Sequence, residues 1–534
     1  MMIILSFLVC TLSVALISWY KTRSTNLNSV SGLFFGGKNN GYLVVAGSLV
    51  LTNLSANQFV GENESVFINN MSVMAWGVTS VFAILLVSQF LLPVYFKYGM
   101  VTTPDFLALR YDDSTKKLVS IVFLLSYAVN LLPPVLYGGA VALTSMFNVD
   151  VLLNISYWQC IWVMVWILGI TGSAYTIIGG LKAITISDTL LGAGFLLIGI
   201  CLPFYAINHL GQGNFFNGLN LLLTKHTSHL NAIGGEHDAI PFSTIFTGMI
   251  LVNIYYWGME QYIVQQSLAA KSLKDAQKGM AFAAFAKLIS PLLINLPGLV
   301  AVHLYTDVTN TATVFPMVVA EVLPTFLLGF TAALIFGAAM TTYNAGLHGS
   351  STLFVLNIYK PYCQKRGIGI EDKNLIKVSK RFEIVLSLCA MFAAPFILFA
   401  SSGFYAYLQQ VSGLFSMPVL TIVAVGFLNK RVPPAAAKAG LIVFMVSYFL
   451  CEYVFDVRLH FLHVLAILFF IVSALMMIYG YFFPMQNSAV FNPPVALDVN
   501  IVPWTKRHIA AVFLIICMIL LYLFFSPLGA AKLR

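Results

Sequence analysis

Long apolar runs, separated by short polar connections, follow one another along almost the whole chain. A helix that crosses the hydrocarbon core of a bilayer needs about 20 apolar residues. Fourteen runs come close to this length, so the pattern predicts an all-α integral membrane protein. The predicted spans are 2–20, 42–60, 73–96, 118–146, 156–178, 185–207, 241–266, 277–304, 325–357, 382–400, 404–428, 436–455, 461–483 and 508–526.

The second span carries a polar interruption, the stretch from Thr52 to Gln58 with the sequence TNLSANQ. Amide and hydroxyl groups are costly in hydrocarbon, which offers them no hydrogen-bond partners. Ser and Asn also compete for backbone hydrogen bonds, so a helix with several of them is easily broken. A break at mid-membrane depth is tolerated where the freed backbone groups line a cavity or bind something. A single such residue often only joins neighbouring helices, but this cluster predicts a ligand or ion site.

A second polar interruption, from Asn253 to Gln261, lies in the seventh span, five spans after the first. Broken segments at matching positions in two halves of a chain are typical of inverted-repeat transporters, whose site lies between the repeats. Aromatic residues within membrane spans more often only pack, so Tyr255 alone indicates little. The pair Gln409-Gln410 adds a further polar cluster to the eleventh span.

The ninth span contains two adjacent hydroxyl residues, Thr341 and Thr342, one turn after Ala338. Hydroxyl and carbonyl oxygens close together form the hard-oxygen cluster that a small cation prefers. The alternative is structural, because a threonine on a membrane helix usually bonds the carbonyl four residues before it. The sequence pattern leaves both interpretations open.

Ionisable residues inside the spans are candidates for function, because a lone charge there is costly unless it is paired. Lys287 lies in the eighth span, and Glu260 is expected near the cytoplasmic boundary of the seventh. Asp188 follows Gly179-Gly180 and is expected to start the sixth span as an N-cap-like acid. For Asp188 a structural role and a role in ion release are equally open.

Composition agrees with a membrane protein, since 59% of the 534 residues are hydrophobic and 9% are charged, against roughly 25% charged residues in soluble domains. The net charge is +9, but the Lys and Arg residues are concentrated in alternate connections. By the positive-inside rule this distribution predicts that both termini lie outside, and it removes the reason to expect a nucleic-acid partner. The lipid bilayer is the expected surrounding, and no obligate protein partner is predicted.

Other classes of protein find no support in the sequence. The seven cysteines have neither metal nor redox spacing. Paired catalytic carboxylates, a nucleophile elbow and a phosphate-binding loop are not recognisable, so we expect no enzyme and no catalytic residues. A repeated filter-like segment, which would indicate a channel, is not recognisable either.

The chain resembles the sodium/solute symporter family along almost its whole length, and within it most closely the bacterial sodium/galactose symporters and related putative sodium/sugar transporters. The most specific matching stretches are 252–258, 261–265 and 268–272, with 55–61, 104–107, 179–181 and the Gln409 segment in support. The resemblance implies fourteen helices with a LeuT-like five-plus-five inverted repeat and broken helices. It also implies one polytopic transporter domain over 1–534, with an extra first helix and loop (1–40), two inverted repeats (41–210 and 241–428) and extra C-terminal helices (435–534).

Residue by residue, the resemblance implies two adjoining sites. The sodium site would use the backbone carbonyls of Leu51, Leu54 and Ala338 with the hydroxyls of Thr341 and Thr342, and Asp188 would lie on the sodium exit path. The sugar site would use Gln58, Ser80, Asn253, Lys287 and Gln409, with Tyr256 as an aromatic gate and Trp257 beside it. Several convergent hydrogen-bonding groups and a flat apolar face suit a hydroxyl-rich ligand.

The chain also departs from the family pattern. Where galactose carriers have a glutamate in the third span, this chain has Trp76-Gly77-Val78, and the family's Glu before Gln58 is Asn57 here. The family's Asn before Gln261 is Glu260. Loss of an acceptor carboxylate changes which hydroxyl pattern is accepted, so galactose is not the expected solute. Glu62 or Glu64 is a candidate replacement that the sequence does not place.

The function predicted from the sequence is sodium-coupled import of a sugar or sugar-like polyhydroxylated solute by alternating access. The co-transported sodium ion is the expected cofactor, and the bacterial inner membrane is the expected location. Two alternatives remain open: a sodium-independent or proton-coupled carrier of the same fold, and a symporter for a non-sugar organic solute.

Overall fold

The computed structural model describes residues 2–23, 27, 29–54, 56–236, 238–308, 310–369, 371–399, 404–455, 457–485 and 501–531. Ser55 and the side chains of Ala56 and Asn57 lie outside the described part. The described elements are helices, apart from one isolated bridge between Asn40 and Ala270. The predicted all-α class is confirmed.

The helices divide into two sets along the chain. The first set is α1 (Met2–Thr22), α2 (Val30–Phe35), α3 (Tyr42–Asn53), α4 (Ala56–Ile68), α5 (Ala75–Lys97), α6 (Asp105–Arg110), α7 (Asp113–Ser126), α8 (Leu132–Phe147), α9 (Val149–Leu153), α10 (Tyr157–Leu210) and α11 (Phe215–Thr224). The second set is α12 (Gly248–Gly258), α13 (Gln261–Leu268), α14 (Leu273–Ser290), α15 (Leu296–Leu304), α16 (Val314–Val322), α17 (Thr325–Leu353), α18 (Lys360–Lys365), α19 (Asp372–Ala393), α20 (Phe404–Leu428), α21 (Pro434–Phe449), α22 (Phe461–Phe482) and α23 (Arg507–Phe524).

Short tighter or wider helical turns connect several of these helices. The tighter turns are η1 (Gly36–Lys38), η2 (Met71–Met74), η4 (Thr227–Leu230), η5 (Phe242–Phe246), η7 (Thr311–Thr313) and η9 (Ala394–Phe399). The π-helical turns are η3 (Tyr127–Leu131), η6 (Pro291–Asn295), η8 (Phe354–Tyr359) and η10 (Leu450–Val454). Such wide turns inside helices are frequent at functional sites.

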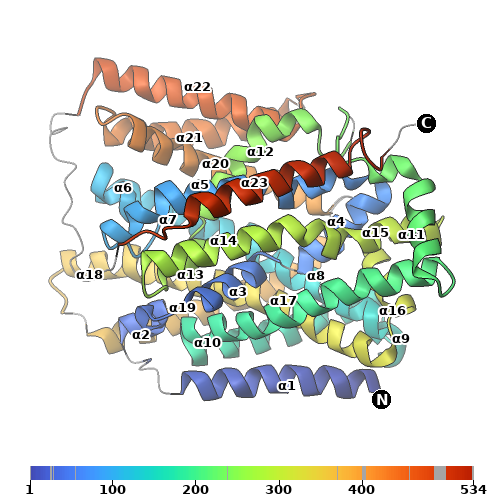
Figure 1. The fold of residues 1–534 in the computed structure, drawn as a ribbon. Helices are drawn as coiled ribbons and strands as arrows, with labels where there is room; N and C mark the ends of the chain where they lie inside the picture. Colours follow the sequence, from blue (N-terminus) through green and yellow to red (C-terminus); the bar gives the residue numbers. More distant parts are fainter. Residues whose placement is uncertain are drawn as a thin grey trace.

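Most helices run side by side along one direction, as a bundle that crosses a membrane requires (Figure 1). Among the described residues, eleven helices are long and apolar enough to span a bilayer, or twelve when the bent pair α3 and α4 counts as one span. The prediction of fourteen spans stays a prediction. The difference arises at α10, which holds two predicted spans, and at α12 and α13, which are too short to be counted.

The long helix α10 contains a sharp break at Gly180, whose φ of 59° and ψ of −170° are not helical. A straight helix of 54 residues would be roughly 80 Å long, far more than the hydrocarbon thickness of about 30 Å. Ser18 of α1 contacts both sides of the break, with its hydroxyl at 2.5 Å from the Tyr175 hydroxyl and at 3.0 Å from the Ala183 carbonyl oxygen. Glycine suits this position because the backbone is left-handed there.

Both polar interruptions that the sequence indicates are breaks in helices. In the first, α3 ends at Asn53, α4 begins at Ala56, and the two helices differ in direction by 54°. In the second, α12 ends at Gly258 and α13 begins at Gln261. The carbonyl and amide groups at these ends are freed from helical hydrogen bonds, so the two predictions of broken helices are confirmed.

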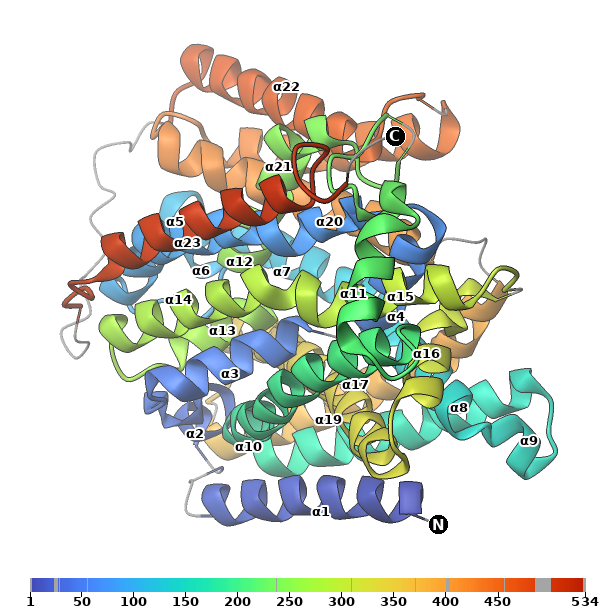
Figure 2. The ribbon, with the colours of Figure 1, turned by 45° about the vertical axis from the view of Figure 1, so that its right-hand side comes forward.

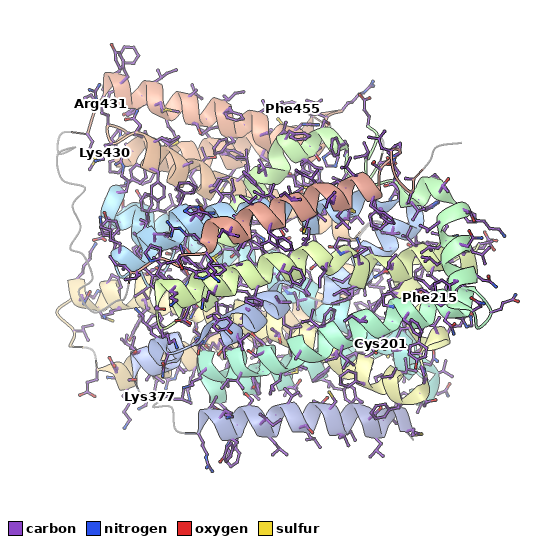
Figure 3. All side chains as sticks on the ribbon, viewed as in Figure 1. Cys201, Phe215, Lys377, Lys430, Arg431 and Phe455 are labelled. Carbon is purple, nitrogen blue, oxygen red and sulfur yellow. The ribbon has the colours of Figure 1, made fainter. Side chains whose placement is uncertain are left out.

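The beginning of α1 and the end of α23 lie at the same end of the bundle in both views (Figures 1 and 2). Lys377, Lys430 and Arg431 lie at the opposite end, away from Cys201 and Phe215 (Figure 3). This distribution agrees with the predicted charge asymmetry of the connections. Helix α1 packs on α10 and α17 with one face, and many of its apolar side chains are exposed, as expected of a lipid-facing helix.

Candidate functional site

A central cavity of about 170 Å³ lies where the two broken helices meet α5, α14 and α20. All seven residues predicted for the solute site line it. They are Gln58 on α4, Ser80 on α5, Asn253, Tyr256 and Trp257 on α12, Lys287 on α14 and Gln409 on α20. Because these residues come from five helices spread over 350 positions of the chain, their convergence is a property of the fold, while their role in binding stays a prediction.

Hydrogen bonds fix part of this polar lining. The Asn253 side chain donates to the Thr79 hydroxyl at 3.0 Å, and Thr79 donates to the Ala75 carbonyl oxygen at 2.5 Å. Ser80 donates to the Gly77 carbonyl oxygen at 2.6 Å. These bonds use the donors, so the amide oxygen of Asn253 and the hydroxyl oxygen of Ser80 keep their acceptor lone pairs. Ser412, which follows Gln409 and Gln410 in the polar cluster of the eleventh predicted span, also lines the cavity. Ser126, Asn130 and Ser416 add polar groups that sequence analysis did not single out.

Aromatic rings form the apolar part of the lining. Tyr256 and Trp257 lie edge to face with ring centroids 5.6 Å apart, and Tyr256 and Tyr262 do so at 6.1 Å. The Tyr262 hydroxyl donates to the Tyr256 hydroxyl at 3.2 Å, which fixes the orientation of both rings. Trp257 is almost fully buried, so Tyr256 offers the more accessible ring face of the adjacent pair.

Glu260 lines the central cavity, and its expected position near the cytoplasmic boundary stays a prediction. Its carboxylate accepts a hydrogen bond from the Tyr127 hydroxyl and interacts with the Tyr255 hydroxyl. Both tyrosines line the same cavity. Their participation was missed because aromatic residues in membrane helices usually only pack, and only the fold brings α7 and η3 against α12.

Lys287 lines the cavity together with Gln58, and both side chains are buried. One helical turn after Gln58, Glu62 accepts a hydrogen bond from the Gln58 amide at 2.5 Å. Glu62 also interacts electrostatically with Lys287 and contacts the Asn295 side chain. The structure thus places Glu62 next to the cavity, whereas Glu64 accepts a hydrogen bond from Thr311 at 2.5 Å and faces another cavity.

Gly77 in the third predicted span lies where α5 approaches α14 closely. A side chain at Gly77 would begin 2.9 Å from the Ser290 hydroxyl and 3.6 Å from the Lys287 carbonyl oxygen. A larger residue at this position would therefore require the Ser290 side chain or its surroundings to shift.

The predicted cation site lies at the break between α3 and α4. The Thr342 hydroxyl donates both to the Thr52 carbonyl oxygen at 3.1 Å and to the Ala338 carbonyl oxygen at 3.2 Å. Leu51 and Leu54 flank Thr52, and Leu54 leaves the helical conformation with a ψ of 78°. The structure therefore brings the freed end of α3 to the hydroxyl pair on α17. The coordination of a cation by these groups stays a prediction.

Asp188 is not an N-cap, because it lies eight residues after the break at Gly180, inside the second half of α10. It is fully buried. Its Oδ2 atom accepts hydrogen bonds from Ser48 at 2.9 Å and Thr52 at 3.2 Å, and the carboxylate also interacts with Thr341. Within the described residues, its Oδ1 atom makes no hydrogen bond. Asp188 thus joins α10 to both helices of the predicted cation site.

A second cavity of about 520 Å³ adjoins the central one, and Trp76 and Gln409 line both. Its other walls include loop residues 239–240 and 459–461. Toward the opposite end, hydrogen bonds hold α13 against earlier segments: Asn40 pairs with Ala269 and Lys271 at 3.1 Å each, and Gln265 donates to the Phe34 carbonyl oxygen at 2.7 Å. The central cavity therefore adjoins the second cavity, and α13 is held in place by backbone and side-chain hydrogen bonds.

Broken helices that enclose a polar cavity at the centre of a membrane bundle define a secondary transporter fold. The model of the sodium:solute symporter family matches residues 33–443. The chain belongs to this family. It is therefore a transporter and not an enzyme, and sodium is the ion that it transports together with its solute.

Individual relatives agree with this assignment. The chain is 38% identical over 531 residues to the uncharacterized symporter YidK of Escherichia coli, covering 99% of this chain and 92% of that protein. It is 26% identical over 437 residues to the sodium/glucose cotransporter of Vibrio parahaemolyticus, covering 78% of each. Sodium/myo-inositol cotransporter 2 of Oryctolagus cuniculus is 26% identical over 82% of this chain and 68% of that protein.

Two solved structures share the fold. A sodium-coupled sialic acid symporter in a substrate-bound outward-open state superposes with a TM-score of 0.76 and 17% identity, over 91% of this chain and 99% of that one. The nucleobase-cation-symport-1 family transporter Mhp1 superposes with a TM-score of 0.55 and 14% identity, over 87% of this chain and 98% of that one.

Proposed function

We propose that the protein imports a sugar or sugar-like polyhydroxylated solute together with sodium by alternating access. The observation that carries this proposal is the convergence of Gln58, Ser80, Asn253, Lys287 and Gln409 with the rings of Tyr256 and Trp257 on one cavity. Amide, hydroxyl and ammonium groups suit the many hydroxyls of such a solute, and the rings suit its apolar face. The similarity to a sodium/glucose cotransporter and to a sodium/myo-inositol cotransporter supports the same class.

In this proposal sodium binds at the carbonyls of Leu51, Leu54 and Ala338 and the hydroxyls of Thr341 and Thr342. Asp188, which already contacts Thr52 and Thr341, receives the ion on its way to the cytoplasm. Sodium favours the state in which the freed end of α3 faces α17, and this is the state in which the central cavity is complete. Coupling then follows from the different affinity of sodium for the two states.

The proposed architecture has fourteen spans and a five-plus-five inverted repeat, with repeats over 41–210 and 241–428 and extra helices before and after them. Counting α10 as two spans and α12 with α13 as one broken span gives this number. Both termini then lie on the external side of the bacterial inner membrane. This orientation agrees with the labelled basic residues at the other end of the bundle.

A non-sugar organic solute is the second candidate. The observation in its favour is that Lys287 and Glu260, two ionisable residues, both line the central cavity. A solute with a charged group would find an opposite charge at either residue.

Uptake of labelled sugars, polyols and organic acids into proteoliposomes tests the proposal, with and without an inward sodium gradient. The Thr341→Ala, Thr342→Ala double variant is measured in parallel. We expect uptake of at least one neutral hydroxylated solute that requires sodium and is lost in the double variant. Uptake that is limited to organic acids would favour the second candidate, and uptake that ignores sodium would contradict the cation site.

A further inference from the structure

Glu62 is a buried carboxylate at the edge of the central cavity, on the same face of α4 as Gln58 and one helical turn further on. Its side chain is about 1% exposed, and it accepts the Gln58 amide hydrogen at 2.5 Å. Gln58 lines the cavity. Because one amide hydrogen is committed to Glu62, the orientation of the Gln58 amide toward the cavity is fixed by this carboxylate.

Lys287 supplies the positive charge that Glu62 faces. The Lys287 side chain is 2% exposed and lines the cavity, and Glu62 is the charged group with which it interacts among the described residues. In that part of the chain the Lys287 ammonium takes part in no ion pair and no hydrogen bond. Its charge is thus balanced from nearby while its N–H donors stay free for a ligand.

The other acids near the cavity do not balance Lys287. Glu260 is held by the hydroxyls of Tyr127 and Tyr255, and Asp188 by those of Ser48 and Thr52. Glu64 bonds Thr311 and lines the second cavity. Among the acids near the central cavity, Glu62 is therefore the one that interacts electrostatically with Lys287 within the described residues.

This arrangement distinguishes between classes of solute. A neutral polyol accepts hydrogen bonds from the free Lys287 donors and leaves the pair undisturbed. A solute with a carboxylate competes for the Lys287 charge, and binding it leaves Glu62 buried with an uncompensated negative charge, which is strongly unfavourable. Specificity of this kind comes from a repulsive group as much as from attractive contacts.

We propose that Glu62 is the residue that makes the solute site selective for neutral hydroxylated solutes and excludes anionic ones. The proposal rests on the solute site described under the proposed function.

The test compares neutral and anionic solutes of the same ring skeleton. Purified protein in proteoliposomes is given an inward sodium gradient and labelled glucose, galactose or myo-inositol, each in parallel with glucuronate or galacturonate. In the unchanged protein we expect neutral uptake to exceed uronate uptake by about tenfold or more. In Glu62→Gln we expect the ratio of uronate to neutral uptake to rise by about tenfold, because Lys287 is then uncompensated.

Three variants complete the test. Glu62→Gln combined with Lys287→Met removes both charges and is expected to cancel the gain in uronate uptake. Glu321→Gln, a matched change outside the cavity where the acid bonds Tyr305 and His209, is expected to leave the ratio unchanged. If Glu62→Gln does not fold, Glu62→Asp retracts the carboxylate from Lys287 and is expected to change the ratio in the same direction by a smaller factor.

The outcomes separate the two proposals. Suppose the protein transports neutral solutes with sodium, but the ratio of uronate to neutral uptake is unchanged in Glu62→Gln or Glu62→Asp. This result would overturn the proposed role of Glu62 and leave the proposed function intact. A protein without sodium-dependent uptake of any neutral hydroxylated solute would overturn the proposed function, and with it this inference. Preference of the unchanged protein for uronates would contradict the assigned selectivity directly.

Discussion

The hydroxyl of Thr342 on α17 donates to the carbonyl oxygen of Thr52 at the end of α3, with 3.1 Å between the two atoms. This contact crosses between two helices that lie 290 residues apart in sequence. It places a side-chain oxygen beside a backbone oxygen that the helix break has freed, the combination that a small hard cation requires.

We expect Thr342→Ala to raise the sodium concentration for half-maximal uptake by about tenfold, because one of five oxygen ligands is lost. Thr342→Ser keeps the oxygen and is expected to stay within about threefold of the unchanged protein. The measurement is a sodium titration of solute uptake in proteoliposomes. The control is Thr331→Val on the same helix, whose hydroxyl bonds only the Leu327 carbonyl oxygen at 2.8 Å. A sodium affinity in Thr342→Ala that equals that of the unchanged protein would contradict the proposed cation site.

Asp188 joins α10 to α3 through Ser48 and Thr52. We expect Asp188→Asn to weaken the apparent sodium affinity by about tenfold and to slow sodium exchange, because the negative charge that attracts the ion is removed. Labelled sodium exchange across the proteoliposome membrane measures both effects. Thr185→Val is the control, since its hydroxyl bonds the Lys182 carbonyl oxygen of its own helix. Unchanged exchange in the asparagine variant would leave Asp188 with a structural role only.

Tyr256 offers a ring face to the central cavity and accepts the Tyr262 hydroxyl hydrogen. We expect Tyr256→Ala to raise the solute KM by about tenfold or more, since stacking on the ring is lost. Tyr256→Phe retains the ring and is expected to change KM by no more than about threefold. Solute titration of sodium-driven uptake decides between the two. Similar KM values for both variants would show that the hydroxyl, and not the ring, matters.

Asp112 caps α7 just outside the membrane-spanning part of that helix. Its carboxylate accepts hydrogen bonds from the Thr115 amide at 2.7 Å and from the Lys438 ammonium at 3.1 Å. Partial burial raises the pKa of this carboxyl, but these bonds and those from the Thr115 and Ser114 hydroxyls outweigh burial and lower the pKa from 3.8 to about 2. A folded-state pKa below the unfolded value means that the stabilisation is complete above pH 3.8 and is lost as the pH falls toward 2.

We therefore expect Asp112→Ala to lower the free energy of unfolding by about 1 kcal/mol at pH 7, the usual cost of a lost helix cap. The difference from the unchanged protein shrinks as the pH falls through the window from 3.8 to about 2. The measurement is thermal unfolding of both proteins in detergent micelles at several pH values, followed by tryptophan fluorescence. Asp112→Asn keeps the cap and is expected to cost less. A difference that is constant with pH would contradict the charged cap.

Both helix breaks could be predicted from the sequence, because polar side chains in an apolar run have few structural explanations. Residues at the cavity were predicted where a family motif covers them, as for Asn253 and Gln409. Glu62 could not be placed, because its neighbour Lys287 lies on another helix and only packing brings them together. Glu260 could not be assigned to the cavity, because its partner Tyr127 lies far away in the sequence and only the fold brings the two together.

The number of spans shows the same limit. A left-handed backbone conformation at Gly180 divides α10 into two parts. The sequence predicted two separate spans in this region because a polar connection lies between the two apolar runs. Asp188 was predicted as a cap because the expected start of the sixth span, residue 185, lies after the actual break at Gly180. The apolar pattern thus predicts how many runs exist better than it predicts where each begins.

The break between α3 and α4 separates Thr52 from Gln58, so the proposed ion site and the proposed solute site adjoin the same break. By thermodynamic reciprocity, any factor by which sodium tightens solute binding is also the factor by which solute tightens sodium binding. If both proposed sites adjoin this break, a leak of sodium without solute and a leak of solute without sodium share one origin in the fold.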